Sequence, residues 1–121
     1  MHWHDLLSVP FIMGGDDVAT GLDCWGMARE VCRRAGLLAP GRPEVADPRV
    51  TTERVVAALV RINNAERIGD MLFSDPEGRG YPAHVASVVA PGWAISTTKR
   101  YGPHVAPLHR VACDYGAWRV A

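Results

Sequence analysis

Helical spacing of apolar residues marks the first half of the chain, and its clearest example begins at Cys24. Apolar side chains there recur at positions i, i+3, i+4 and i+7, which is typical of a helix with one buried face. The positions are Cys24, Met27, Ala28, Val31 and Ala35. Asp23 is a suitable N-cap, and Gly36 is a suitable residue just beyond the last turn. We therefore predict a helix from about Cys24 to Gly36, with the thiol on its buried face.

The segments around this helix have weaker patterns. Residues 3–8 are expected to form a short helical turn, and Gly14-Gly15-Asp16-Asp17 is expected to be a loop. Residues 37–50 contain three prolines and are expected to connect two elements. From Thr51 or Thr52 the apolar spacing predicts a second helix that ends near Asn63-Asn64.

The second half of the chain has the spacing of strands. Candidate strands are residues 70–73, 83–90, 93–98, 104–108 and 117–120. Pro91-Gly92 joins the second and third of these as a hairpin. Helices followed by antiparallel strands predict an α+β fold. At 121 residues, the chain is interpreted as one domain spanning residues 1–121.

Composition narrows the classes of function. The 13 basic and 13 acidic residues balance, which argues against a nucleic-acid partner because phosphate binding uses clustered Lys and Arg. No run approaches the ~18 apolar residues of a membrane span. The first residues lack the pattern of a signal peptide, so synthesis in the cytoplasm without export is expected. Three cysteines without paired spacing do not form a disulfide framework.

The candidate chemistry lies at Cys24. A thiol in the first turn of a helix is near unpaired backbone amides and the positive end of the helix dipole, and both favour the thiolate. A candidate base is His84, which shares a strand face with Ala86, Val88 and Ala90. We expect these small residues to let the Cys24 helix dock on that face, so that thiol and imidazole meet.

The order of these residues resembles a known family. Asp23-Cys24-Trp25-Gly26 at a helix start, then Gly69-Asp70 before a strand, then His84, is similar to the NlpC family of cysteine peptidases. That resemblance implies a minimal papain-like fold, with N-terminal helices packed on an antiparallel sheet, and cleavage of bacterial cell-wall peptides. The opening segment from Pro10 to Met27 looks like phage and prophage tail members of the family. Gly102, Val105, Pro107 and Leu108 look like its closing strand.

The resemblance also implies roles for individual residues. Cys24 would be the nucleophile and His84 the general base. The family usually has His, Asn or Gln at the third position, whereas this chain has Ser96, a short and neutral residue. Thr98, or a water held by Ser96, is an alternative orienting group. Backbone amides around Cys24 would bind the oxyanion, and Asp23 and Trp25 are candidate substrate contacts.

Each assignment has a structural alternative. Cys24 could be a buried apolar cysteine, His84 a satisfied histidine, and Ser96 an ordinary hairpin serine. Trp25 could pack under the helix, and Asp70 is expected to close a turn near the sheet. Cys32 and Cys113 are expected to be structural. Neither His2 with His4 nor any other group has convincing metal-ligand spacing, so no metal or cofactor is expected. His104 and His109 could line the groove.

Three functions remain open at this stage. The first is a cysteine endopeptidase that acts on peptidoglycan stem peptides, as a phage or prophage tail component with other tail proteins as partners. The second is a tail or wall-binding module of the same fold that has lost activity, because Ser96 replaces the usual third residue. The third is an acyl transferase with the same Cys and His, since a dyad does not determine the acceptor.

Overall fold

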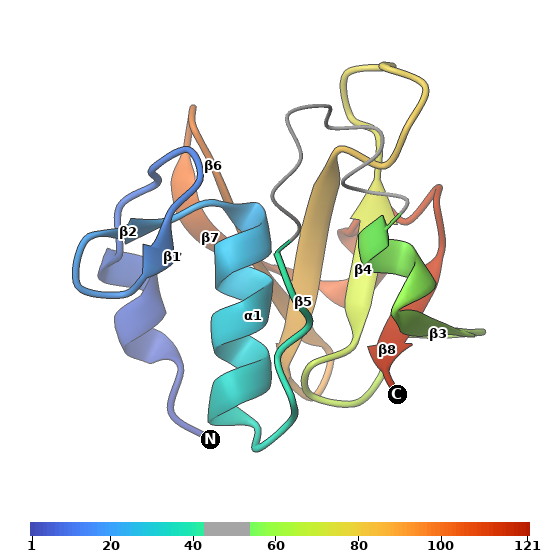
Figure 1. Cartoon of the computed structure of the whole chain (residues 1–121), viewed down its shortest axis with the longest axis horizontal. Helices are drawn as coiled ribbons and strands as arrows, with labels where there is room; N and C mark the ends of the chain where they lie inside the picture. The colour runs from blue at the N-terminus through green and yellow to red at the C-terminus, as the bar shows by residue number, and fades with distance from the viewer. Residues whose placement is uncertain (43–53) are drawn as a thin grey trace.

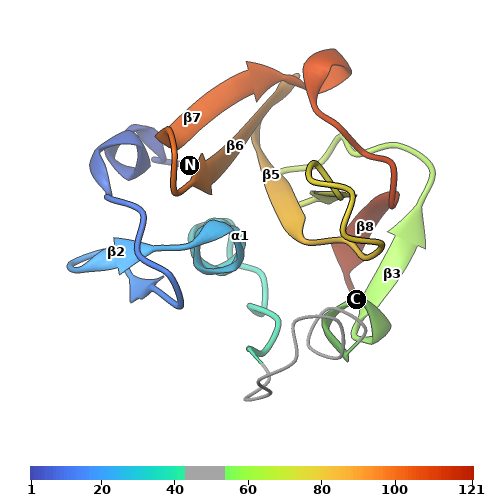
Figure 2. The ribbon, with the colours of Figure 1, turned by 90° about the horizontal axis from the view of Figure 1, so that it is seen from above.

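The computed structural model describes residues 1–42 and 54–121 and shows a main helix packed against a curved antiparallel sheet (Figures 1 and 2). The N-terminal elements are η1 (His4–Ser8), β1 (Asp16–Asp17), β2 (Gly21–Leu22) and α1 (Cys24–Arg34). They are followed by β3 (Leu59–Ile62), β4 (Met71–Ser74), β5 (His84–Ala90), β6 (Trp93–Thr98), β7 (Gly102–Pro107), η2 (Leu108–Arg110) and β8 (Ala117–Val120). The main sheet has the order β3-β8-β4-β5-β6-β7, and the predicted α+β class is confirmed.

Helix α1 begins and ends as its sequence predicts. The Asp23 carboxylate accepts a hydrogen bond from the Gly26 amide at the N-terminus. At the C-terminus, Gly36 has φ +74°, and its N–H donates to the Arg33 carbonyl while the Leu37 N–H donates to that of Cys32. These two bonds form a Schellman motif, in which glycine takes the left-handed conformation at low cost.

The helix packs on one face of the central strands. Met27 and Val31 of α1 are fully buried in a cluster that includes Val89 of β5 and Ile95 of β6. Nearer the start of the helix, Trp25, Ala28 and Cys32 share a second cluster with strands β4 and β5. The predicted core position of Cys32 is thus confirmed.

The predicted strands of the second half are confirmed to within about two residues, but the second helix is partly wrong. Its first residues, 51–53, lie outside the described residues, and residues 54–57 are helical. Residues 59–62, however, form β3, which pairs with β8. The apolar residues of this segment fit both the helical and the strand period, and pairing with β8 selects the strand. The loop predicted at 14–17 is also partly wrong, because Asp16–Asp17 form β1 and pair with β2.

The face of β5 on which α1 docks differs from the prediction. Val85 and Val89 contact the helix clusters, whereas Ala86 and Val88 lie in a separate cluster on the other side of the strand. Residues of the segment after β7, including Leu108 and Val111, cover that other side. Val85 and Val89 have larger side chains than alanine and bury more apolar area under the helix. The small residue Ala86 instead faces the segment after β7.

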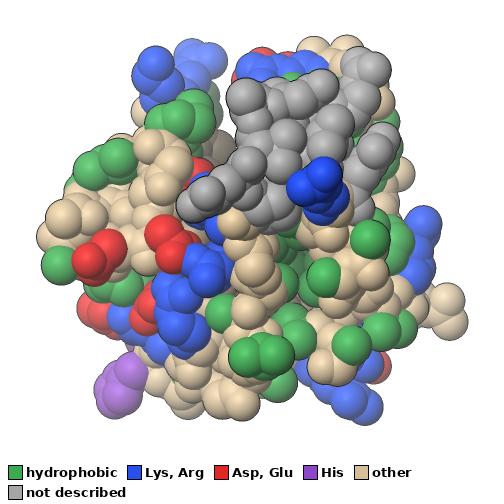
Figure 3. All heavy atoms as spheres, viewed as in Figure 1, with side chains coloured by type: hydrophobic (Ala, Val, Ile, Leu, Met, Phe, Trp, Pro, Cys, Tyr) green, Lys and Arg blue, Asp and Glu red, His purple; other side chains and the backbone are tan. Residues whose placement is uncertain are grey.

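The arginines of α1 are paired with acidic neighbours. Arg29 contacts Asp16, Arg33 contacts Glu30, and Arg34 contacts both Asp5 and Glu30. Basic and acidic side chains are accordingly intermixed on the face that carries β1 and α1 (Figure 3). Within residues 1–42 and 54–121, no helix is both long and apolar enough to span a membrane.

Candidate active site

Cys24 is the first residue of α1, and its position depends on the carboxylate of Asp23. One Asp23 oxygen accepts from the Gly26 amide at 2.7 Å and the other from the Gly14 amide at 3.1 Å. The Arg42 guanidinium donates to both oxygens, at 2.7 and 2.8 Å. Asp23 therefore ties the loop before β1, the start of α1 and the segment at Arg42 together, and both of its oxygens already have protein partners.

The thiol of Cys24 lies at the beginning of β5. It packs against the cluster that contains Val85, and the backbone N–H groups of Val85 and Trp25 favour its ionised form. Burial acts in the opposite direction and dominates, raising the pKa of the Cys24 thiol to about 11. The thiolate expected from the helix position is therefore not the resting form at neutral pH, because the cost of desolvation exceeds the effect of the amides.

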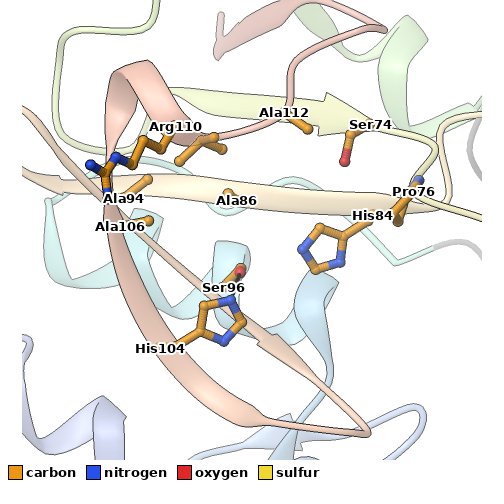
Figure 4. A pocket seen from close by; sticks show the side chains of 11 residues that line it. Ser74, Pro76, His84, Ala86, Ala94, Ser96, His104, Ala106, Arg110 and Ala112 are labelled. Carbon is orange, nitrogen blue, oxygen red and sulfur yellow. Dashed lines mark hydrogen bonds between the residues drawn. The ribbon is translucent and has the colours of Figure 1, made fainter.

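His84 is the first residue of β5, the same strand start that the Cys24 thiol packs against. Its side chain, however, projects into a cavity on the side of the sheet away from α1 (Figure 4). The cavity has a volume of about 190 Å³. It is lined by Ser74, Pro76, His84, Ala86, Ala94, Ser96, His104, Ala106, Arg110, Val111 and Ala112. Burial lowers the pKa of His84 below its ordinary 6.5, and electrostatic repulsion from His104 lowers it further.

The structure brings Ser96 and His84 to this cavity but places Cys24 outside its lining. Ser96 is 7% exposed and faces the cavity from β6. Within the described residues, no hydrogen bond joins the His84 ring to Ser96 or to the Cys24 thiol. Cys24 and His84 are instead related through the backbone, because the amide beside the thiol belongs to the residue that follows His84.

His104 is the cavity residue to which the sequence assigned no definite role. It lies directly across from Ser96 in the β6–β7 register, and its Nε2 is 3.2 Å from the Ser96 hydroxyl. Its Nδ1 is 3.0 Å from the Gly102 carbonyl oxygen. The sequence feature that could have indicated this contact is the turn at residues 99–101, because a hairpin there places residues 96 and 104 opposite each other.

Two other residues have structural contacts. Trp25 is 9% exposed and packs near Phe73, with ring centroids 6.4 Å apart. Asp70 is 1% exposed, accepts from the Glu66 and Arg67 amides, and pairs with Arg119 through both oxygens. The expected turn-closing role of Asp70 is confirmed. Among residues 1–42 and 54–121, no three His, Cys, Asp or Glu side chains are grouped to hold a metal ion.

Comparison with solved structures identifies this arrangement of helix and sheet. The NlpC/p60 domain of the peptidoglycan hydrolase SagA matches with a TM-score of 0.63 and 23% sequence identity, over 98% of this chain and 92% of that chain. The protein has the NlpC/p60 fold. The predicted minimal papain-like fold is thereby confirmed.

A second NlpC/p60 structure leads to the same conclusion. It is described as similar to a lipoprotein of the NLP/P60 family from Staphylococcus aureus, and it matches with a TM-score of 0.60 and 23% identity. The match covers 96% of this chain but 39% of that one, so the NlpC/p60 fold occupies less than half of the longer protein. No family model and no curated protein matches the sequence of the present chain.

Proposed function

We propose that this protein is a cysteine peptidase that hydrolyses amide bonds in the stem peptides of bacterial peptidoglycan. The observation that carries the proposal is the position of Cys24, at a helix start and against the Val85 amide of the strand that His84 begins. The shared fold with the NlpC/p60 domain of a peptidoglycan hydrolase supports the choice of reaction and substrate class.

The proposed reaction is acyl transfer through a thioester. As the Cys24 sulfur attacks the scissile carbonyl carbon, His84 takes the thiol proton and a tetrahedral oxyanion forms. The oxyanion is met by amides of the first turn of α1, which have no partners within the helix. When the C–N bond breaks, His84 gives the proton to the leaving amine. His84 then takes a proton from water, whose oxygen displaces the sulfur and releases the acid product, and the proton returns to the sulfur.

The cavity beside His84 suits a substrate that carries a carboxylate. Its floor is formed by small apolar side chains, among them Ala86, Ala94 and Ala106. The Arg110 side chain lines the cavity on the opposite side from His84 (Figure 4), and within the described residues Arg110 has no ion-pair partner. D-Glutamyl and diaminopimelate residues of stem peptides carry the acidic group that a guanidinium recognises.

Replacing Cys24 with alanine tests the proposal. With purified peptidoglycan and a synthetic stem peptide as substrates, Cys24→Ala should lower amide hydrolysis at least about a thousandfold, because the group that forms the covalent bond is lost. The products are measured as new amino groups and by mass spectrometry.

Cys113→Ala is the matched control, because Cys113 is also a partly buried free thiol but belongs to a different hydrophobic cluster, which includes Leu72 and Val88. This variant should keep wild-type activity. If Cys24→Ala hydrolyses the substrates at the wild-type rate, the proposal is wrong.

The proposed biological setting is a phage or prophage tail, where the protein would be made in the cytoplasm and act on the wall as part of the particle. Support comes from the resemblance of residues 10–27 to tail members of the NlpC family. Mass spectrometry of purified particles would test this setting, and absence of the chain from them would contradict it.

A catalytically impaired wall-binding module is the second candidate. It is favoured by Ser96, which bonds to His104, and by the lack of a hydrogen bond from Cys24 to His84 within the described residues. The module predicts that wild-type protein and Cys24→Ala sediment equally with peptidoglycan and that neither cleaves it. Measurable turnover by the wild type would exclude this candidate.

A further inference from the structure

The hydrogen bonds of His104 determine which of its nitrogens carries a proton. Nδ1 lies 3.0 Å from the Gly102 carbonyl oxygen, which accepts hydrogen bonds and cannot donate, so Nδ1 bears the hydrogen. In the neutral ring, Nε2 is then an acceptor. The partner of Nε2 at 3.2 Å is the Ser96 hydroxyl, which must donate its proton to the ring.

This arrangement leaves the oxygen of Ser96 with its lone pairs available. Ser96 and His84 line the same cavity, with the His104 ring beside Ser96 (Figure 4). An N–H of the His84 ring that meets Ser96 would therefore find an acceptor whose own proton is already turned away. Hydrogen bonds in such a chain polarise one another, so a serine that donates to an imidazole is a stronger acceptor than an isolated serine.

We propose that His104 is a positioning residue that orients the His84 ring through the hydroxyl of Ser96. The chain of bonds would run from the His84 N–H to Ser96 Oγ, from the Ser96 O–H to His104 Nε2, and from the His104 Nδ1–H to the Gly102 carbonyl. This inference rests on the proposed function, in which His84 is the base. The bond from His84 to Ser96 forms when substrate occupies the site, since catalytic hydrogen bonds are often long in free enzymes.

The geometry gives this chain a substitute for the usual third residue. A serine alone is too short and too weakly polar to hold an imidazolium well. Its register partner on β7 supplies the larger polar group one strand further from His84. The histidine that the family resemblance leads one to seek at position 96 is thus present at position 104, and the two positions are joined by a hydrogen bond.

Variants at positions 104 and 96 test the inference through the rate of hydrolysis. His104→Phe removes the acceptor and should lower kcat about 10- to 100-fold with little change in KM, which is part of the 10²- to 10⁴-fold contribution of a general base. His104→Gln keeps an acceptor near the position of Nε2 and should retain most of the activity. Ser96→Ala should lower kcat as much as His104→Phe does, because each breaks the same chain.

Rescue separates a positioning role from a structural one. Ser96→Asn places an amide at the usual third position, in the cavity that His84 also lines, so adding it to His104→Phe should restore kcat to within a few-fold of the wild type. His109→Phe is the matched control, since His109 is exposed on η2 outside the cavity lining, and this variant should behave as the wild type. Wild-type kcat in a folded His104→Phe protein, or a lowered kcat that Ser96→Asn does not restore, would overturn the inference.

Nitrogen-15 NMR of the histidine rings provides a readout that needs no turnover. In the free protein, His104 should be the Nδ1–H tautomer, and Ser96→Ala should shift its ring nitrogens. With stem peptide bound to the Cys24→Ala protein, Ser96→Ala should also shift those of His84. A predominantly Nε2–H tautomer would overturn the inference even if the variants fail to fold. Failure of the proposed function gives a different result, namely hydrolysis that persists in Cys24→Ala.

Discussion

At the scale of single residues, the resting states of Cys24 and His84 follow from where each side chain is buried. Burial raises the pKa of the Cys24 thiol to about 11, and burial together with repulsion from His104 lowers the pKa of His84. Both shifts favour the neutral forms, so at pH 7 the site holds a thiol and a neutral imidazole. In the proposed reaction, His84 must then remove the thiol proton during attack, because no preformed thiolate is present.

The pH dependence of alkylation at Cys24 tests this resting state. Iodoacetamide reacts with the thiolate, so the rate should rise about tenfold per pH unit from pH 7 to 10 without reaching a plateau. Peptide-level mass spectrometry distinguishes Cys24 from Cys32 and Cys113. The same chain in denaturant is the control, and there the rate should level off near the ordinary thiol pKa of ~8.5. A plateau already reached at pH 7 in the folded protein would instead show a stable thiolate.

The residues of the site differ in how far the sequence could reveal them. Cys24 and His84 stand in local motifs, at a helix start and a strand start, so short stretches of sequence point to them. His104 has no such motif. Its contact with Ser96 depends on the register of β6 and β7, and its tautomer depends on the Gly102 carbonyl. The contact and the tautomer both depend on the three-dimensional arrangement of the turn between β6 and β7, which no local motif specifies.

At the scale of elements, the start of α1 depends on a close backbone contact. A Cβ at Gly26 would lie 2.1 Å from the Gly15 carbonyl oxygen, well inside any real contact. Gly15 belongs to the loop that leads into β1, and its carbonyl also accepts from the Asp23 amide and from Arg42. The loop can therefore lie across the first turn of the helix only if residue 26 has no side chain.

Gly26→Ala should destabilise the protein even though alanine is the better helix former. The gain in helix propensity is about 1 kcal/mol, whereas an overpacked backbone contact costs about 1–3 kcal/mol and displaces the loop. Urea denaturation measures the difference, and Gly41→Ala is the control because a Cβ there meets nothing within 4 Å. A Gly26→Ala protein as stable as Gly41→Ala would show that the loop gives way without cost.

Helices and strands were predicted correctly where the apolar residues follow only one period, either helical or extended. Residues 84–90 and 93–98 flank Pro91-Gly92, and Gly92 has φ +80°, so local turn chemistry and strand propensity agree. Residues 59–62 gave a helical expectation because Val55, Val56, Leu59 and Val60 also fit a helical face. Their strand forms by pairing with β8, nearly sixty residues later, and no local pattern specifies such a distant partner.

At the scale of the whole molecule, Asp70 connects segments that are distant in the sequence. The carboxylate accepts two hydrogen bonds from the Glu66 and Arg67 amides, just before β4. It also pairs at 2.7 Å through each oxygen with Arg119 of β8, close to the C-terminal residue. Burial raises the pKa of Asp70, but the Arg119 guanidinium and the two amides outweigh it and hold that pKa below its ordinary 3.8.

The sign of the resulting pH effect follows from this lowered pKa. A carboxyl group that is more acidic in the folded than in the unfolded state stabilises the fold above its unfolded pKa. That contribution is lost as the pH falls through the lower, folded value. Stability due to Asp70 should therefore be complete at neutral pH and decrease only below about pH 4.

Asp70→Asn should remove this contribution while keeping the shape of the side chain. The unfolding free energy at pH 7 should fall by about 3 kcal/mol, the lower end of the ~3–5 kcal/mol range for breaking a buried pair, because the Arg119 side chain is 25% exposed and can reach water. The variant should also lose stability less steeply than the wild type between pH 4 and 2. Glu77→Gln, which breaks a surface pair with Arg79, is the control and should leave the urea midpoint unchanged. Equal midpoints for Asp70→Asn and Glu77→Gln would show that the connection between β4 and β8 does not depend on this charge.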